Sequence, residues 1–273
     1  MDSKIPIIRR NLNIAASYGA MARHIRFGQA EELARLHTGK TLTYSQIVKL
    51  YTGTFSDALL TEEYITFCKH LVKLGIAEKA EYTDLVLQDA SVSYLKNNYC
   101  DAAFHKFSQM MGATAVYETD FNSVCESVYS GNSTYAIVPL FNTNDGLMVS
   151  LYRMILRYEL KAVMSTDIMM SDDTTETKFM LLSRRTYTDT EYTNILFSFT
   201  DDANNTLPGL LTVCAQEGIK LRFINTLPLE YTDDRREIVI DMSLGKCDKQ
   251  SVLLFLRTAL PDINIIGMYK AVK

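Results

Sequence analysis

The sequence contains no tryptophan, only five prolines, and no apolar run close to the roughly 20 residues that a helix needs to cross a bilayer. Its start, from Met1 to Lys4, lacks the basic stretch followed by an apolar one that begins a secretory signal. These absences predict a cytoplasmic protein that does not enter a membrane. The chain is 47% hydrophobic and 22% charged, so it can bury a core and should form two or three globular units.

The five cysteines are odd in number, lie far apart and form no C-x-x-C pair. Such spacing favours neither a disulfide framework nor a zinc site. The four histidines also lack a spacing that suits metal ligands. We therefore expect reduced, mostly buried thiols, no metal and no other cofactor.

The charge is distributed unevenly along the chain. Residues 1–84 carry 11 Lys and Arg against 9 Asp and Glu, which gives +2, and the net charge of −4 leaves −6 for the remainder. A nucleic-acid-binding face normally shows a clustered basic stripe, which this near-neutral balance does not provide. Nucleic acid is therefore only a weakly supported partner of the N-terminal part.

The N-terminal part reads as helical. Residues 30–36 form one amphipathic stretch, and Thr43 to Gln46 resembles a capping box that starts a helix running to Tyr51. A longer helix should begin after Thr61 and end at Gly75.

The segment 76–87 could form a short hairpin or wing. A winged-helix domain and an ordinary small helical domain both remain open interpretations of residues 1–88.

From about residue 90 the pattern changes to short β-rich runs that alternate with helices, which is typical of an α/β layer. The last part has the order strand, helix, strand, strand, helix, strand, which is a ferredoxin-like βαββαβ unit. Its predicted elements are 196–199, 209–217, 220–228, 236–242, 249–259 and 263–269.

Several motifs in this order resemble those of prephenate dehydratases. Residues 120–128, followed by the strand 135–139, are similar to the first catalytic lobe of that family. The family's Pro-Ile-Glu-Asn-Ser turn is matched by Pro139 to Thr143, with Phe141 in place of the glutamate. Residues 177–182 resemble the family's Thr-Arg-Phe strand.

The C-terminal part resembles the regulatory ACT domain of the same family, on Leu207 to Leu211 and Asn225 to Pro228. The resemblance implies a mixed α/β and α+β protein with three domains. These are a helical domain in 1–88, a single α/β lobe in 89–188 and an ACT domain in 191–273.

Prephenate dehydratases are lyases of phenylalanine biosynthesis that convert prephenate to phenylpyruvate, water and carbon dioxide. By resemblance, the catalytic candidates are Thr177, Lys178, Asn142 and Thr143. Lys178 stands where the family has arginine, and it lacks the planar fork that grips a carboxylate through two hydrogen bonds. Thr177 is also readable as an ordinary strand residue, and Asn142 as a turn former.

The family inserts a whole second lobe before its Thr-Arg-Phe strand, whereas only residues 164–176 stand there in this chain. Half of the substrate cleft should therefore be missing, and the strand 179–182 should rejoin the first sheet through a short loop. The family's glycine loop also fails, because residues 96–101 contain no glycine. Catalysis is therefore uncertain.

For the ACT domain, the resemblance implies a homodimer and allosteric regulation by an aromatic amino acid. The residues that would contact this ligand are Leu207, Pro208, Gly209, Leu210, Asn225 and Thr226. Two hypotheses remain open. The protein is either a prephenate dehydratase with residual activity, or a noncatalytic amino-acid sensor whose N-terminal domain contacts DNA or a protein partner.

Overall fold

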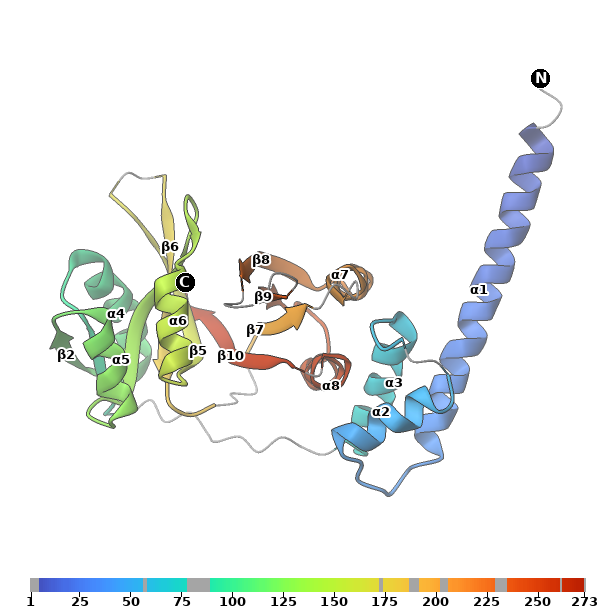
Figure 1. The fold of residues 1–273 in the computed structure, drawn as a ribbon, viewed down its shortest axis with the longest axis horizontal. Helices are drawn as coiled ribbons and strands as arrows, with labels where there is room; N and C mark the ends of the chain where they lie inside the picture. Colours follow the sequence, from blue (N-terminus) through green and yellow to red (C-terminus); the bar gives the residue numbers. More distant parts are fainter. Residues whose placement is uncertain are drawn as a thin grey trace. The chain divides into compact units, whose positions relative to one another are not determined.

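The computed structural model describes the chain apart from a few short segments and the ends (Figure 1). The described residues are 5–55, 58–77, 89–171, 174–186, 192–201, 206–228, 235–260 and 262–272, with side chains undescribed for 5–16, 110 and 111. Two compact units emerge from the contacts of the chain. The first combines Met1–Lys79, Thr206–Glu217 and Cys247–Pro261, and the second combines Ala80–Asn205, Gly218–Lys246 and Asp262–Lys273.

The first unit is helical in its described residues. Its helices are α1 (Ile5–Arg35), α2 (Tyr44–Thr52), α3 (Glu62–Lys73), α7 (Thr206–Glu217) and α8 (Lys249–Ala259). The segment predicted as an ACT domain therefore places its helices in this unit and its strands in the other. Among the described residues, no helix combines the length and the apolar character that crossing a bilayer requires.

The predicted ends of α2 and α3 are confirmed, whereas the predicted stretch 30–36 is only the last part of the longer α1. Thr43 caps α2 through a full capping box with Gln46, and the Thr61 hydroxyl accepts from the backbone N–H of Tyr64 at the start of α3. Gly75 follows the end of α3 with a φ of +66°, a left-handed conformation that favours glycine. Residues 78–88, which hold most of the predicted hairpin or wing, lie outside the described residues.

The core of the first unit is built around α3. This helix packs against α1, α7 and α8, and the ring of its Tyr64 lies 6.2 Å from that of Phe255 on α8. Buried aromatic side chains contribute to the contact, and the ring centroids of Tyr51 and Tyr64 lie 4.6 Å apart. Large buried rings contribute strongly to packing, so the N-terminal helices and the helices α7 and α8 form one core.

The second unit is organised by a ten-stranded sheet. Its order is β2-β1-β3-β6-β5-β10-β7-β9-β8, with the short β4 paired to β3. The strands are β1 (Ser91–Leu95), β2 (Thr114–Glu118), β3 (Tyr135–Asn142), β4 (Gly146–Leu147), β5 (Lys161–Met169), β6 (Glu176–Ser183), β7 (Asn194–Asp201), β8 (Lys220–Pro228), β9 (Arg236–Ser243) and β10 (Asn264–Val272). The predicted alternation of strands and helices is confirmed, as is the βαββαβ order at the C-terminal end.

One end of the sheet is a parallel α/β layer. Strand β1 pairs in parallel with β2 and β3, and the connections contain α4 (Asn98–Met111) and α5 (Phe121–Tyr129). Asn97 and Asp120 cap these helices through their side-chain oxygens. A third helix, α6 (Val149–Arg157), follows β4. The apolar core is split in two, one part shared with α4 and the other with α5 and α6.

A hairpin stands between α6 and the C-terminal strands. Strands β5 and β6 pair antiparallel along their length, from Lys161 opposite Ser183 to Met169 opposite Glu176. Strand β6 also pairs with β3 of the first sheet. The prediction that the Thr-Arg-Phe-like strand rejoins the first sheet is therefore confirmed.

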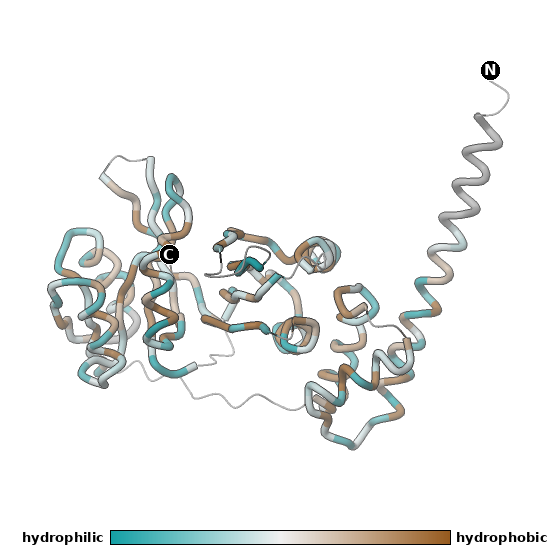
Figure 2. Tube along the Cα trace, viewed as in Figure 1, coloured by the Kyte–Doolittle hydropathy of each residue, from teal (hydrophilic) through white to brown (hydrophobic). Residues whose placement is uncertain are grey.

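The other end of the sheet is antiparallel and is joined to the lobe without a break. Strand β10, which has an apolar stretch in its first half (Figure 2), pairs in parallel with β5 and antiparallel with β7. At this join Gly267 lies against Ala162, and a Cβ added to Gly267 would stand 2.5 Å from both the Cβ and the carbonyl oxygen of Ala162. The join therefore requires glycine for close approach.

Candidate functional site

The four predicted catalytic residues meet at one end of β3 and β6. In the register of these strands Asn142 lies opposite Thr177, and Phe141 lies opposite Lys178. Thr143 follows directly and exchanges two 3.0 Å bonds with Glu176, one from its backbone N–H and one into its hydroxyl. The structure thus brings the four residues of the resemblance together in sequence register.

Their side chains are occupied by the backbone rather than free for a ligand. The Asn142 Oδ1 accepts from the backbone N–H groups of Asn144 at 2.7 Å and of Asp145 at 3.1 Å. These two hydrogen bonds close a turn of the kind that asparagine side chains form in loops generally. The turn-forming interpretation of Asn142 accounts for its geometry, and the Thr143 hydroxyl similarly holds Glu176.

Thr177 and Lys178 point to opposite faces of the sheet, because neighbouring residues on a strand alternate. Thr177 lies on the face covered by α4, where it is 1% exposed, opposite Ile168. Its hydroxyl has no hydrogen-bond partner among the described residues. Lys178 lies on the other face, opposite Asp167. The pair cannot act on one ligand from the same face of the sheet.

Lys178 is buried and neutralised. It is 5% exposed, and its Nζ lies 3.2 Å from the Asp167 Oδ1. The backbone carbonyl of Asp167 also accepts a 2.9 Å bond from the Nζ of Lys106 on α4, which fixes this part of β5. A buried ammonium requires such a partner, since desolvating it alone is costly.

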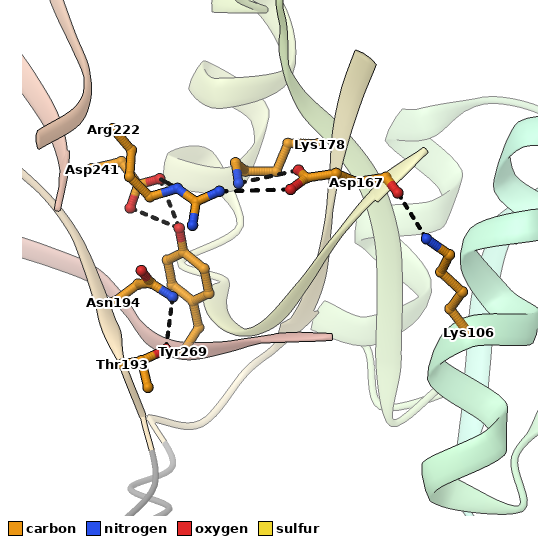
Figure 3. A network of polar contacts seen from close by, with 8 residues as sticks. All are labelled: Lys106, Asp167, Lys178, Thr193, Asn194, Arg222, Asp241 and Tyr269. Carbon is orange, nitrogen blue, oxygen red and sulfur yellow. Dashed lines mark hydrogen bonds and ion pairs between the residues drawn. The ribbon is translucent and has the colours of Figure 1, made fainter. Parts of the chain in front are cut away.

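The ion pair continues into a network of side chains from β5, β6, β8, β9 and β10, which Figure 3 shows from close by. The Arg222 Nη2 on β8 lies 3.6 Å from the second oxygen of Asp167, and its Nε lies 3.6 Å from the Oδ2 of Asp241 on β9. The Tyr269 hydroxyl on β10 lies 2.7 Å from both carboxyl oxygens of Asp241. The charges of Lys178 and Arg222 are therefore matched by those of Asp167 and Asp241.

The electrostatics of the network centre on Asp241, which is 1% exposed. Burial raises the pKa of Asp241 to about 6, against the lowering effects of the Tyr269 hydrogen bond and of the Lys178 and Arg222 charges. Burial also raises the pKa of Tyr269 well above its ordinary value, helped by the neighbouring carboxylate, so its hydroxyl stays protonated. Asp241 is thus the group of the network that changes charge in the mildly acidic range.

A second set of contacts links the lobe to the antiparallel strands. Glu237 on β9 accepts from the Tyr152 hydroxyl at 2.6 Å and pairs with Arg153 at 2.9 Å, both on α6. The rings of Phe141 on β3 and Phe223 on β8 stack at 4.8 Å with 8° between their planes. Within the second unit, the antiparallel strands pack onto the lobe through both polar and aromatic contacts.

The predicted ligand residues Leu207 to Leu210 lie on α7, the first helix of the ACT-like segment, and so belong to the first unit. Leu207, Pro208 and Gly209 belong to the first turns of α7, and Leu210 is fully buried. A Cβ added to Gly209 would stand 3.0 Å from the Cβ of Leu60, so an N-terminal residue covers this glycine. The surface around Gly209 is therefore partly occupied by the protein itself.

The other predicted ligand residues lie on β8, the edge strand of the sheet. Asn225 is half-buried and Thr226 is exposed, opposite Val239 and Ile238 of β9. Because β8 ends the sheet, its outer backbone groups have no strand beside them in the described part of the chain. These two residues therefore lie at an accessible edge.

The thiols are not nucleophiles. Four of the five free cysteines are buried, as the sequence predicted. Burial raises the pKa of Cys100 to about 11, and those of Cys68, Cys125 and Cys214 to about 12. Such thiols stay protonated near neutral pH. The described residues contain no cluster of metal-ligating side chains.

No family model matches the sequence, and no curated protein matches it. Solved structures do match, and the class they define is that of the prephenate dehydratase fold. A prephenate dehydratase from Streptococcus mutans has a TM-score of 0.56 at 21% identity, covering 67% of this chain and 100% of that one.

Two further structures are similar to this chain. A prephenate dehydratase from Arthrobacter aurescens in complex with L-Phe has a TM-score of 0.50 at 14% identity, covering 66% of this chain and 90% of its own. GqqA, described as a novel type of quorum quenching acylase, has a TM-score of 0.54 at 17% identity, with coverages of 66% and 94%. These likenesses show a shared fold, which two different activities have used.

The sequence interpretation missed Asp167, Arg222, Asp241 and Tyr269. One signal was present, since Asp241 is a lone carboxylate inside the apolar strand from Ile238 to Met242. A charged residue in such a run is almost never buried unless it is paired. The identity of its partners came only from the strand order.

Proposed function

We propose that this protein is a noncatalytic regulator that keeps the fold of a prephenate dehydratase and responds to an aromatic amino acid. The observation that carries the proposal is Lys178, at the position of the family's carboxylate-binding arginine. It is buried and bound to Asp167, so its charge is compensated inside the protein. Lys178 is thus a structural residue here.

The charge of the surrounding network supports the same conclusion. Prephenate carries two carboxylates, and a site for it needs cations that are not already neutralised. Around Lys178 stand Asp167 and Asp241, which repel an incoming dianion and match the charges of Lys178 and Arg222. Bringing a dianion to this face would draw Lys178 and Arg222 away from Asp167 and from the buried Asp241, which is costly.

The hairpin of β5 and β6 is a further support. Only residues 164–176 precede the strand that resembles Thr-Arg-Phe, and β5 and β6 pair directly there, so we propose that this chain lacks the wall that would face the substrate. Donors that act on developing charge are worth far less in water than in a closed site.

The regulatory half of the proposal rests on the C-terminal strands. Their order β10-β7-β9-β8 with all neighbours antiparallel, and the βαββαβ connection, resemble an ACT domain. We propose Asn225 and Thr226 on β8 as polar contacts of the amino acid, and Leu207 to Leu210 as the loop contact. We also propose that the free edge of β8 forms a homodimer.

The N-terminal helices would pass the signal to a partner. Arg23 and Arg26 are engaged by Glu62 and Glu63 at 3.8 and 3.5 Å, which favours a protein partner over DNA because these guanidinium groups are already paired.

Thermal unfolding of the full chain with L-Phe, L-Tyr, L-Trp or L-Ala tests the regulator. An amino acid at 100 times its dissociation constant should stabilise the fold by about 2.7 kcal/mol. Asn225→Leu should abolish the shift, whereas Leu221→Ala, at another exposed position of β8, should keep it. No shift with any of the aromatic amino acids would refute the sensing role.

The second candidate is a residual prephenate dehydratase, which the meeting of the four predicted residues at one strand end favours. Phenylpyruvate formation from prephenate measures it against an active control enzyme. We expect no product from the wild type or from Lys178→Arg. Turnover by the wild type that disappears in Thr177→Val would replace the regulator with the enzyme.

A further inference from the structure

Helix α1 carries an exposed apolar stripe. Tyr18, Met21 and Ile25 are 70%, 63% and 50% exposed, and they are spaced by three and four residues. That spacing puts them on one face of a helix and is the repeat of coiled-coil core positions. In the amino-acid sequence the same spacing continues backwards to Ile14, Asn11 and Ile7.

The opposite face of α1 is the one that the chain itself uses. Ala30 and Ala34 are fully buried where α1 packs on α3. Arg23 and Arg26, on the same side of the helix as these alanines, pair with Glu62 and Glu63 at the start of α3. At 100° per residue the stripe faces away from α3, so the intramolecular contact leaves it uncovered.

Helix α1 extends beyond the part of it that packs on α3. All residues from Ser17 to Arg26 are exposed, whichever way they point on the helix. Isolated helices of this size are marginal in water, because nucleation is costly and packing supplies most helical stability. A freestanding stretch with an apolar stripe therefore points to a partner that covers it.

The residues that flank the stripe indicate what kind of partner can cover it. The positions on either side of Tyr18, Met21 and Ile25 are Ser17, Ala22, His24 and Gln29. None is a Lys, Arg, Asp or Glu, so two copies of this face meet without like-charge repulsion between flanking residues. An acidic or basic partner would find no complementary charge there.

We infer that α1 pairs with α1 of a second copy of this chain in a two-stranded coiled coil, with Tyr18, Met21 and Ile25 as core residues. The contact between the two helices ends at Gly28, which occupies the next core position, where α1 meets α3. This interface is separate from the edge of β8 and does not rest on the proposed function.

The mass of the full chain in solution tests the interface. The wild type should sediment at 31.0 kDa multiplied by at least two at micromolar concentrations, because the proposed contact at the edge of β8 would add further copies. Met21→Glu should raise the dimer dissociation constant at least tenfold, because it puts two carboxylates into the seam. Ala20→Glu adds the same charge at an exposed neighbouring position off the stripe and should leave the dimer unchanged. Circular dichroism of both variants checks that the fold is kept.

Three results would overturn the inference. One is a wild type that stays at 31.0 kDa. Another is an equal mass for Met21→Glu and Ala20→Glu, as a dimer formed through β8 would give. The third is a monomeric wild type that co-sediments with phosphatidylserine vesicles while Met21→Glu does not, which would assign the stripe to a membrane surface.

Discussion

The two faces of the β5–β6 hairpin differ in how they hold their polar groups. On the face covered by α4, the hydroxyls of Thr166 and Thr177 are buried and have no partner among the described residues. On the other face, Asp167 and Lys178 neutralise each other and connect to Arg222. The pleat of one strand therefore separates Thr177 from Lys178, although the two residues are adjacent in the sequence.

Gly267→Ala should have the largest effect, because both faces depend on the join between β5 and β10. Its new Cβ would stand 2.5 Å from the Cβ and the carbonyl oxygen of Ala162. Overpacking against backbone should lower the free energy of unfolding by about 3 kcal/mol. Urea unfolding measures it, and the double variant with Ala162→Gly should recover only part, since the carbonyl remains. An unchanged midpoint for Gly267→Ala would show that the join is loose.

The network face should make stability depend on pH. The pKa of Asp241 is raised from 3.8 to about 6, so between these values the folded protein binds more protons than the unfolded chain. The free energy of unfolding should therefore fall as the pH rises from about 4 to 6, by about 2 to 3 kcal/mol from this group. Urea unfolding at both pH values measures it. Asp241→Asn should reduce the difference between the free energies of unfolding at the two pH values. If the variant keeps the wild-type pH dependence, another group is responsible for it.

Lys178→Met should destabilise the same face of the hairpin, because it removes the charge that pairs with Asp167. The variant keeps the length of the side chain and leaves Asp167 without its closest cation. Because the Asp167 side chain is 32% exposed, water offsets part of the loss, and we expect about 2 kcal/mol less stability. Chemical denaturation measures this value. Adding Asp167→Leu should restore stability, whereas a further loss in the double variant would contradict the pairing.

Thr177→Val should have the smallest effect and the opposite sign. Replacing a buried hydroxyl that lacks a partner by a methyl group of similar shape should stabilise the fold by about 1 kcal/mol. Thr166→Val on the same face is the matched variant and should behave alike. A thermal melt that shows destabilisation by Thr177→Val alone would reveal a bond to that hydroxyl.

Much of the fold was readable from local patterns. Thr43 and Thr61 marked helix starts, because a cap depends on residues within one turn. The βαββαβ order and the return of the strand 179–182 to the first sheet were also predicted. The division of the chain into units was not, because α7 and α8 share a core with α3, far away in sequence.

The four catalytic candidates taken from the resemblance stay a prediction, although the structure brings them to one end of β3 and β6. The register that places Asn142 opposite Thr177 was not specified by the sequence. Whether Lys178 is free or paired depends on Asp167 across the hairpin, and no motif in the sequence describes that partner.

The helices, strands and caps follow from local patterns, because side-chain periodicity and capping depend on residues close together in the sequence. The meeting of Arg222, Asp241 and Tyr269 with Asp167 and Lys178 depends on the folded sheet. These residues come from five strands, and their electrostatic balance exists only once strand pairing has placed them within reach of one another.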